Sequence, residues 1–147
     1  MGYRISAQAI RMCPSNVKAV MELSPPTTKT ELKRFLVFVG FFRRMVPNYS
    51  KICSGLYDLL KEDRKFECSH EHQQSFEKLR HHWTTDPILV YIDTHPSAEL
   101  TLTVDARATH IGGVLHQKDS QGKMSVACYL GRSLRDIERR TLLNAVV

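Results

Sequence analysis

The sequence predicts an α+β protein in which a small unit of helices is followed by an antiparallel sheet of three to four strands. Two patterns predict this fold class. Between residues 27 and 85, apolar residues recur three and four positions apart, which is the spacing of a helix with one buried face. From residue 88 onward they alternate with polar residues, which is the period of a strand. With 147 residues, 42% of them hydrophobic, the chain can form one ordinary domain or two small ones.

Composition argues against several classes of protein. No apolar run approaches the roughly 18 residues that a membrane span needs, and residues 1–6 lack the apolar core of a secretory signal. The four cysteines are scattered without a C-x-x-C pair, which argues against a disulfide framework and a structural zinc site. We therefore expect an intracellular protein, cytoplasmic or nuclear, without a membrane partner.

The first 26 residues hold a short alternating segment and one helix. Residues 3–11 have the pattern of a terminal hairpin, which cannot stand alone. Pro14 favours a helix start, because proline at the first helical position loses only an N–H that has no helical partner. Pro25 and Pro26 end that helix after about two turns, because proline cannot continue it.

A capping box begins the next helix. Thr28 and Glu31 are three residues apart, so that each side chain can bond a free backbone N–H at the helix start. Pro47 marks the end of the pattern. The apolar face expected between these limits consists of Leu32, Phe35, Leu36, Val39 and Phe42.

Two further helices complete the helical unit. The first ends at the charged loop 61–65, and the second is capped by Ser69 and ends before Asp86 and Pro87. Their apolar positions are Ile52, Leu56, Leu59 and Leu60 in the first helix and Phe76, Leu79 and Trp83 in the second.

The remaining chain has the pattern of consecutive antiparallel strands, with a turn at 119–122 and a helix beginning near Ser133. The expected strands span residues 88–91, 100–105, 111–117 and 124–129. In the second strand, Leu102 and its apolar neighbours point to one face, while Asp105 ends the polar face.

Basic residues concentrate in one window. Residues 29–65 hold nine Lys and Arg against four acids, in a chain whose net charge is +6. Lys33, Val37, Gly40 and Arg44 fall on one helical stripe. Two cations beside a side-chain-free patch suit a nucleic-acid duplex, because phosphates supply most of the affinity and bare backbone avoids steric conflict. Two other interpretations remain open. In one, the basic residues serve only to keep exposed helix faces in contact with water, and in the other, Gly40 lets two helices pack closely.

Asp105 is the candidate catalytic, metal-binding residue. An acid near the end of an apolar strand, followed by Ala106 and a strand with Gly112 and Gly113, is where metal-dependent nucleases hold divalent ions. Such chemistry needs several converging carboxylates, and one aspartate cannot supply that charge. Taken alone, the local pattern favours an ordinary strand-end acid. The histidines and the cysteine between residues 68 and 82 fit no tetrahedral metal pattern.

An ordered string of motifs over nearly the whole chain resembles the reverse transcriptase and RNase H of gypsy-type LTR retrotransposons, which encode retrovirus-like Pol polyproteins. The motifs include Leu32-Lys-Arg-Phe-Leu36, Gly40-Phe-Phe-Arg-Arg44, Pro47-Asn-Tyr-Ser-Lys51, Asp86-Pro-Ile-Leu89, Leu102-Thr-Val-Asp-Ala106, Ile111-Gly-Gly-Val-Leu115 and Tyr129-Leu-Gly-Arg-Ser-Leu134. The resemblance implies a remnant of the polymerase palm at 1–26, a helical thumb and connection at 27–85, and an incomplete N-terminal part of an RNase H-like domain at 86–147.

The resemblance also implies roles for particular residues. A nucleic-acid-binding set on the thumb, which holds the template-primer duplex, consists of Lys33, Gly40, Arg43 and Arg44. Asp105 aligns with the first metal-binding aspartate of RNase H, which in that family helps to hold Mg²⁺ for cleavage of RNA in an RNA/DNA hybrid. The implied partners are RNA/DNA hybrid or duplex nucleic acid and the remaining parts of the polyprotein.

The chain also departs from the family pattern. The pair of adjacent polymerase aspartates is absent, and Glu138-Arg-Arg140 runs into Thr141 without the family's Tyr-x-x-x-Glu-x-Glu segment. We therefore expect a catalytically inactive fragment of an RNA-directed DNA polymerase with RNase H, with no tightly bound metal. The alternative is a non-catalytic nucleic-acid-binding or protein-docking module derived from the thumb.

Overall fold

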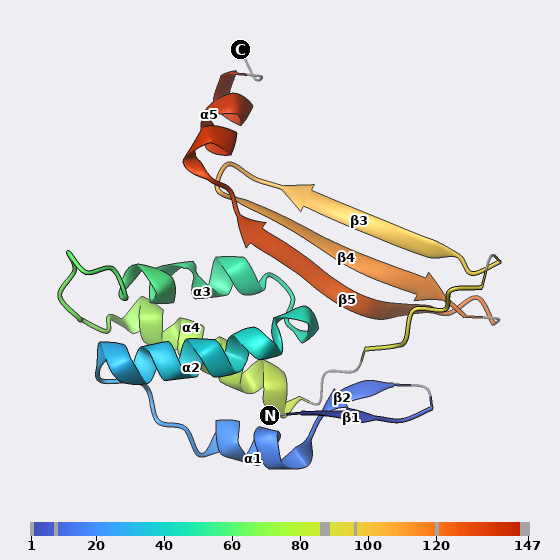
Figure 1. Ribbon diagram of the computed structural model, residues 1–147, viewed down its shortest axis with the longest axis horizontal. Coiled ribbons are helices and arrows are strands. Elements are labelled where there is room, and N and C mark those ends of the chain that lie inside the picture. The colour runs from blue at the N-terminus through green and yellow to red at the C-terminus, as the bar shows by residue number, and fades with distance from the viewer. Residues whose placement is uncertain (1, 8, 86–88, 96, 120, 145–147) are drawn as a thin grey trace.

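The computed structural model describes residues 2–7, 9–85, 89–95, 97–119 and 121–144, the side chains of 142–144 excepted. A layer of helices lies beside a separate antiparallel sheet, as the predicted α+β class requires (Figure 1). No helix among the described residues is long and apolar enough to cross a bilayer. The elements are β1 (Tyr3–Ile5), β2 (Ile10–Met12), α1 (Pro14–Met21), α2 (Lys29–Phe41), the 3₁₀ turn η1 (Arg43–Met45), α3 (Tyr49–Asp58), α4 (His70–Thr84), β3 (Leu100–Ala106), β4 (His110–Lys118), β5 (Met124–Ser133) and α5 (Asp136–Asn144).

The predicted N-terminal hairpin is present and is held by the helices. Strands β1 and β2 pair antiparallel, with Tyr3 opposite Met12. The Tyr3 hydroxyl donates to the Phe41 carbonyl oxygen across 2.8 Å, and the two rings stack with centroids 5.2 Å apart. Helix α1 begins at Pro14, as predicted, and buries Val20 completely. The hairpin is therefore stabilised by α2 and not by its own short ladder.

Helix α2 begins with a displaced form of the predicted capping box. Thr28 is the N-cap, and its hydroxyl accepts from the Glu31 backbone N–H across 3.2 Å. The Glu31 carboxylate reaches one residue further back than predicted, where it accepts from the Thr27 backbone N–H at 2.8 Å and the Thr27 hydroxyl at 2.9 Å. These donors lower the pKa of Glu31, because they stabilise its charged form.

Helix α2 ends earlier than the sequence pattern predicts. It stops at Phe41, and the turn η1 leads from there toward α3, so Arg44 does not continue the stripe of Lys33. The physical reason is burial: Phe42 and Met45 are both fully buried, and the tighter turn directs both side chains into the core. The prediction of one continuous stripe from Lys33 to Arg44 is wrong.

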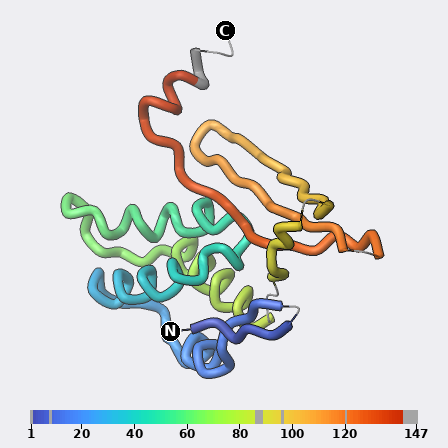
Figure 2. The backbone as a smooth tube through the Cα atoms, turned by 45° about the vertical axis from the view of Figure 1, so that its right-hand side comes forward, coloured from blue at the N-terminus to red at the C-terminus, as the bar shows by residue number. Residues whose placement is uncertain are grey.

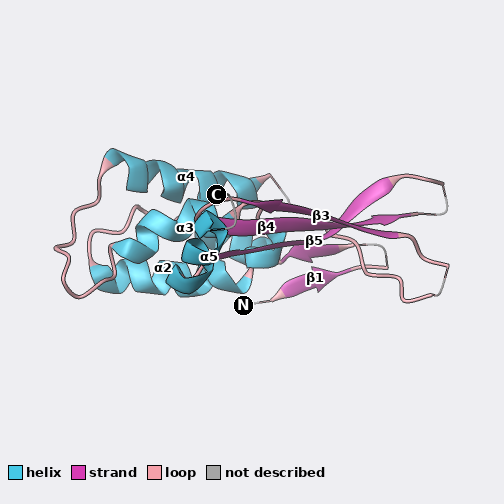
Figure 3. Ribbon diagram, turned by 90° about the horizontal axis from the view of Figure 1, so that it is seen from above, coloured by secondary structure: helices cyan, strands magenta, loops and turns pink. Residues whose placement is uncertain are grey.

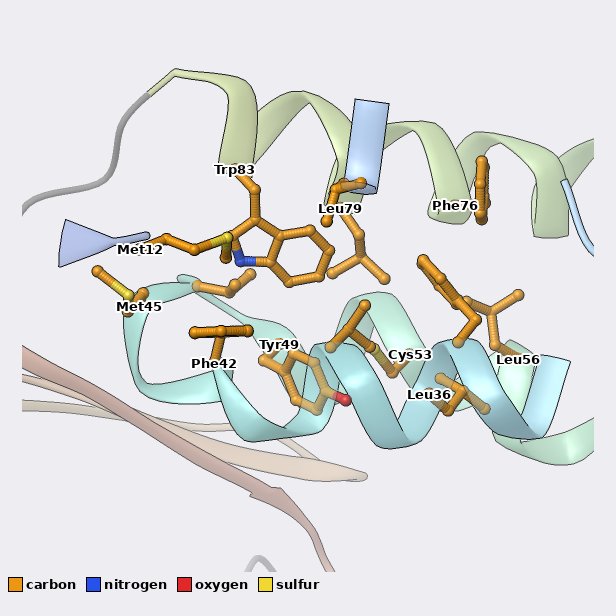
Figure 4. Close-up of a cluster of buried hydrophobic side chains, with 14 of the residues drawn as sticks. Met12, Leu36, Phe42, Met45, Tyr49, Cys53, Leu56, Phe76, Leu79 and Trp83 are labelled. Atoms are coloured by element: carbon orange, nitrogen blue, oxygen red, sulfur yellow. The ribbon is translucent and has the colours of Figure 1, made fainter. Parts of the chain in front are cut away.

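One hydrophobic core joins the hairpin, α1, α2, α3 and α4 (Figure 4). Trp83 and Phe42 are its largest side chains with no exposed surface, and the Phe35 and Phe76 rings meet with centroids 4.7 Å apart. Burial of each such side chain contributes roughly 1.5–3 kcal/mol relative to exposure. The predicted inner face of α4 is confirmed, since Phe76, Leu79 and Trp83 are all buried.

The sheet has the order β3-β4-β5 and attaches to the helices through β5 (Figure 2). Val126 and Tyr129 of β5 pack against the core. Gly131 lies so close to α3 that a Cβ atom would be 3.4 Å from the Ser50 hydroxyl oxygen. Viewed from above, the strands extend away from the helices at one end of the molecule (Figure 3). Strand β3 is therefore the outer edge.

The predicted strand at 88–91 is wrong where the structure describes it; Ile88 lies outside the described residues. Leu89 forms an isolated bridge with Ile10, and the Val90 N–H donates to the Val126 carbonyl oxygen across 2.9 Å. Adjacent residues bond to different strands, so no ladder of consecutive pairs forms. The sheet therefore has three strands, within the predicted three to four.

Candidate functional site

Asp105 lies near the end of edge strand β3. Its register places it beside Gly112 of β4, which in turn pairs with Gly131 of β5. Facing residues on neighbouring strands share one face of the sheet, and neither glycine has a side chain to cover that face. The Asp105 side chain is 68% exposed. The carboxylate is accessible to a ligand that approaches this face.

The surroundings of Asp105 are cationic. Arg107 Nε donates to the Asp105 carboxylate across 3.1 Å. A cavity of about 130 Å³ extends from this pair toward the start of α3 and is lined by Asn48, Ser50, Lys51, Asp105, Arg107 and His110, with Ile111, Gly112, Leu130 and Gly131. Among the described residues of that lining, Asp105 is the only acid, against two permanent cations. A lining with this balance of charge favours an anion over a divalent cation.

Glu138 of α5, the glutamate that follows β5 in the chain, is bound by arginines. Arg132 donates to both carboxylate oxygens across 2.7 and 2.8 Å, and the Arg135 backbone N–H donates across 2.8 Å. These bonds hold the pKa of Glu138 well below its usual range. Arg132 follows Gly131, and successive strand residues point to opposite faces. Arg132 therefore binds Glu138 from the face opposite Asp105.

No metal centre is assembled around Asp105 within the part of the chain that the structure describes. Among those residues, no group of three or more His, Cys, Asp or Glu side chains could hold a metal ion. Asp105 and Glu138 do not converge, because they bond to different arginines on opposite faces of the sheet. Asp105, the predicted first metal ligand, therefore has no second metal-ligating carboxylate beside it among the described residues.

The predicted nucleic-acid-binding residues lie on α2 and η1. Lys33, Arg43 and Arg44 are exposed, and none of them forms a salt bridge with a described residue. Gly40 faces the helices, since a Cβ atom there would lie 3.5 Å from the Tyr49 hydroxyl oxygen. This contact favours the helix-packing reading of Gly40. Contact of all four residues with nucleic acid stays a prediction.

Arg43 and Arg44 line a cavity beside the sheet. A cavity of about 500 Å³ between η1 and the sheet is lined by both arginines, by Arg132, and by apolar side chains that include Leu102, Val104 and Leu130. We call this hollow the arginine cleft. Sequence reasoning missed Arg132 as a site residue, because only the register of β5 brings it opposite η1. The one available signal was its place within the motif Tyr129–Leu134.

The family described as the RNase H-like domain found in reverse transcriptase matches residues 69–144, which is more than half of the chain and includes α4. The Gag-Pol polyprotein of Woolly monkey sarcoma virus is 32% identical over 91% of the chain. The Retrovirus-related Pol polyprotein from transposon opus of Drosophila melanogaster is 33% identical over 94% of it, and the Transposon Tf2-3 polyprotein of Schizosaccharomyces pombe 29% over 84%.

The chain covers only 9%, 15% and 9% of those three polyproteins, respectively. It therefore spans about a tenth of the length of these curated relatives.

Solved structures confirm the fold over almost every residue. The foamy viral protease-reverse transcriptase matches 99% of the chain with a TM-score of 0.74 and 19% identity, both in its complex with ds DNA and in its complex with RNA/DNA hybrid. The chain covers 28% and 21% of those two structures. The resemblance to retroviral and retrotransposon Pol polyproteins is confirmed, and the chain belongs to the family of RNase H-like domains found in reverse transcriptase.

Proposed function

We propose that this chain is a duplex-contacting segment of a reverse transcriptase/RNase H polyprotein, and that residues 1–147 alone do not cleave nucleic acid. The observation that carries the proposal is the arginine cleft, where Arg43 and Arg44 project from one short turn without an acidic partner among the described residues. Phosphate oxygens are the ligands that such unpaired guanidinium groups prefer. The relatives favour a polyprotein segment over a stand-alone docking module.

The proposed partner is an RNA/DNA hybrid or another nucleic-acid duplex. Two features of the chain support it: the net charge of +6, and the concentration of cations in α2 and η1. The related foamy viral enzyme, whose fold this chain shares, binds ds DNA and RNA/DNA hybrid. We further propose that the protein acts in the cytoplasm or the nucleus.

The parent polyprotein would carry the RNA-directed DNA polymerase and hybrid ribonuclease activities. In that larger protein, Asp105 would be the first of several carboxylates around Mg²⁺, which prefers octahedral oxygen ligands. Within residues 1–147 the carboxylate is paired with Arg107, and the lining of its cavity adds Lys51 and His110. Positive charge around a single acid disfavours a divalent cation, so we expect no hydrolysis and no tight Mg²⁺ binding.

A binding experiment tests the nucleic-acid contact. Fluorescence anisotropy with a labelled RNA/DNA hybrid, measured from low to high salt, gives the slope of log affinity against log salt. The double variant Arg43→Ala/Arg44→Ala should bind more weakly and lose up to about 0.9 of slope for each phosphate contact removed. Arg64→Ala/Lys65→Ala is the matched control, because it removes two exposed cations from the loop before α4. Equal losses in both double variants would contradict the proposal.

A nuclease assay tests the expected inactivity. The purified chain is incubated with RNA/DNA hybrid and Mg²⁺, and the products are separated by gel electrophoresis. We expect intact substrate. Cleavage that disappears in Asp105→Asn would show that the isolated chain assembles a working site, whereas cleavage that persists in that variant would indicate a contaminant.

A further inference from the structure

The carbonyl oxygen of Met45, at the end of η1, accepts a hydrogen bond from α4. His82 Nε2 lies 2.6 Å from this oxygen, although the two residues are 37 positions apart in the chain. Because a carbonyl oxygen can only accept, Nε2 must carry the hydrogen. Met45 and Trp83, which follows His82, both belong to the buried core (Figure 4). The partly buried imidazole therefore reaches the turn that carries Arg43 and Arg44.

The backbone bonds that close η1 do not involve the Met45 carbonyl oxygen. The Met45 N–H donates to the Phe42 carbonyl oxygen across 2.9 Å, and the Val46 N–H donates to the Arg43 carbonyl oxygen across 3.2 Å. Such tight turns have poorer hydrogen-bond geometry than an α-helix. The His82 bond therefore fixes an oxygen that these two bonds leave unfixed.

Burial makes the His82 bond difficult to replace. Met45 has no exposed surface, so bulk water does not reach its carbonyl oxygen in the folded chain. A buried carbonyl without a donor is costly, so loss of the imidazole would favour rotation of that peptide group toward solvent. The bond before η1 is different. The Phe41 carbonyl oxygen accepts from Tyr3, but Phe41 is 45% exposed, so water can replace the Tyr3 hydroxyl.

We propose that His82 is a positioning residue, which holds η1 in the conformation that presents Arg43 and Arg44 to a nucleic-acid duplex. The inference rests on the proposed function, in which these arginines contact the duplex. The Met45 carbonyl and the Val46 N–H belong to one planar peptide group, so they rotate together. Rotation of this group would also break the bond from Val46 to Arg43. Both arginines would then lose their fixed direction.

Hydrogen exchange without nucleic acid tests the effect on η1. In His82→Ala, the Val46 amide should exchange faster than in the unaltered chain, because its bond to Arg43 is weakened. His82→Gln should restore slow exchange, since the glutamine amide places an N–H donor near the position of Nε2. The internal reference is the Ile52 amide of α3, which bonds to the Asn48 carbonyl oxygen at 3.0 Å and should exchange at the same rate in all three proteins.

Three results of this experiment would overturn the proposal. The first is unchanged exchange of Val46 in His82→Ala, and the second is no recovery in His82→Gln. The third is equal acceleration of Val46 and Ile52, which would show that His82 stabilises the whole helical unit and not η1 in particular.

Fluorescence anisotropy with a labelled RNA/DNA hybrid tests the consequence for binding. His82→Ala should weaken binding roughly two- to tenfold, because the fraction of chains with η1 in its binding conformation falls by about the factor that one hydrogen bond contributes. The slope of log affinity against log salt should not change, since both arginines remain. His82→Gln should recover the affinity. His81→Ala is the matched control, because it removes the same side chain from an exposed position one residue earlier on α4, and it should bind normally.

The binding results also separate this inference from the proposed function. Normal binding by His82→Ala, together with weak binding by Arg43→Ala/Arg44→Ala, would overturn the inference alone. Normal binding by both variants would overturn the proposed function and the inference with it. A lower salt slope in His82→Ala would show that His82 contacts phosphate itself, and an equal loss in His81→Ala would show an effect unrelated to η1. Either result would overturn the positioning role.

Discussion

The Arg107 guanidinium donates from Nε to the Asp105 carboxylate across 3.1 Å, and both side chains are 68% exposed. The two residues lie at and just beyond the end of β3, so the cation that neutralises the acid comes from the same segment of chain. Neutralisation of Asp105 therefore does not require a metal ion. Because solvent screens exposed ion pairs, their contribution to stability is small.

Asp105→Asn should leave the fold intact. We expect the free energy of unfolding to change by less than about 1 kcal/mol, the usual limit for an exposed ion pair. Urea denaturation followed by circular dichroism measures this change. A much larger loss of stability would mean that Asp105 has a structural role that its exposed position does not indicate.

Trp83→Ala should be the most damaging single change in the core. Trp83 has no exposed surface, and truncation of such a side chain to alanine costs about 3–5 kcal/mol. Trp83→Phe should cost less, because the indole Nε1 has no hydrogen-bond partner among the described residues and its loss breaks no bond. Urea denaturation curves of the two variants compare these costs. Equal costs would contradict this expectation.

Cys53 should resist alkylation in the folded protein. Burial raises the pKa of its thiol to about 12, and its side chain has no exposed surface. Cys13, Cys68 and Cys128 are partly exposed and serve as internal controls. Mass spectrometry after a short treatment with iodoacetamide near pH 8 should find Cys53 least modified, and the difference should vanish in denaturant. Rapid modification of Cys53 in the native protein would contradict the packing of α3.

Glu138 should remain ionised at a pH below 4.5, its ordinary pKa. Bonds from Arg132 and from the Arg135 backbone lower its pKa in the folded chain. The stabilisation that they provide is therefore present above the ordinary pKa and is lost as the pH falls through the lowered value. NMR titration of the carboxyl carbon measures this directly. Arg132→Gln should raise the pKa of Glu138 toward 4.5, and an unchanged titration curve in that variant would exclude Arg132 as the cause.

The helix starts could be predicted because they depend on neighbouring residues. Pro14, Thr28 and Ser69 act within one turn, and the structure confirms all three. The end of α2 could not be predicted in the same way. Its apolar pattern continues through Phe42, and only the burial of Phe42 and Met45 against other elements turns the chain there.

The candidate site depends on strand register, which the sequence leaves undetermined. Alternation alone predicts that Asp105 lies on the polar face of its strand. It does not reveal that the pairing of β4 with β5 changes register between Leu115 and His116. As a result, it also does not reveal that Arg132 lines the arginine cleft and binds Glu138. Long-range pairing also decides that Leu89 bonds to Ile10 instead of extending the sheet.

The opposed bonds of Leu89 and Val90 have a mechanical consequence. Leu89 forms backbone hydrogen bonds with Ile10 of β2, while the Val90 N–H donates to Val126 of β5. The linker between the helices and the sheet is therefore hydrogen-bonded to both the hairpin and the sheet. A force applied to the sheet would reach the helices by two routes: through these adjacent residues and the hairpin, and through Val126 and Tyr129 of β5, which pack against the core. The helical layer and the sheet are thus connected twice, through the linker and through β5, so that movement of one layer would displace the other.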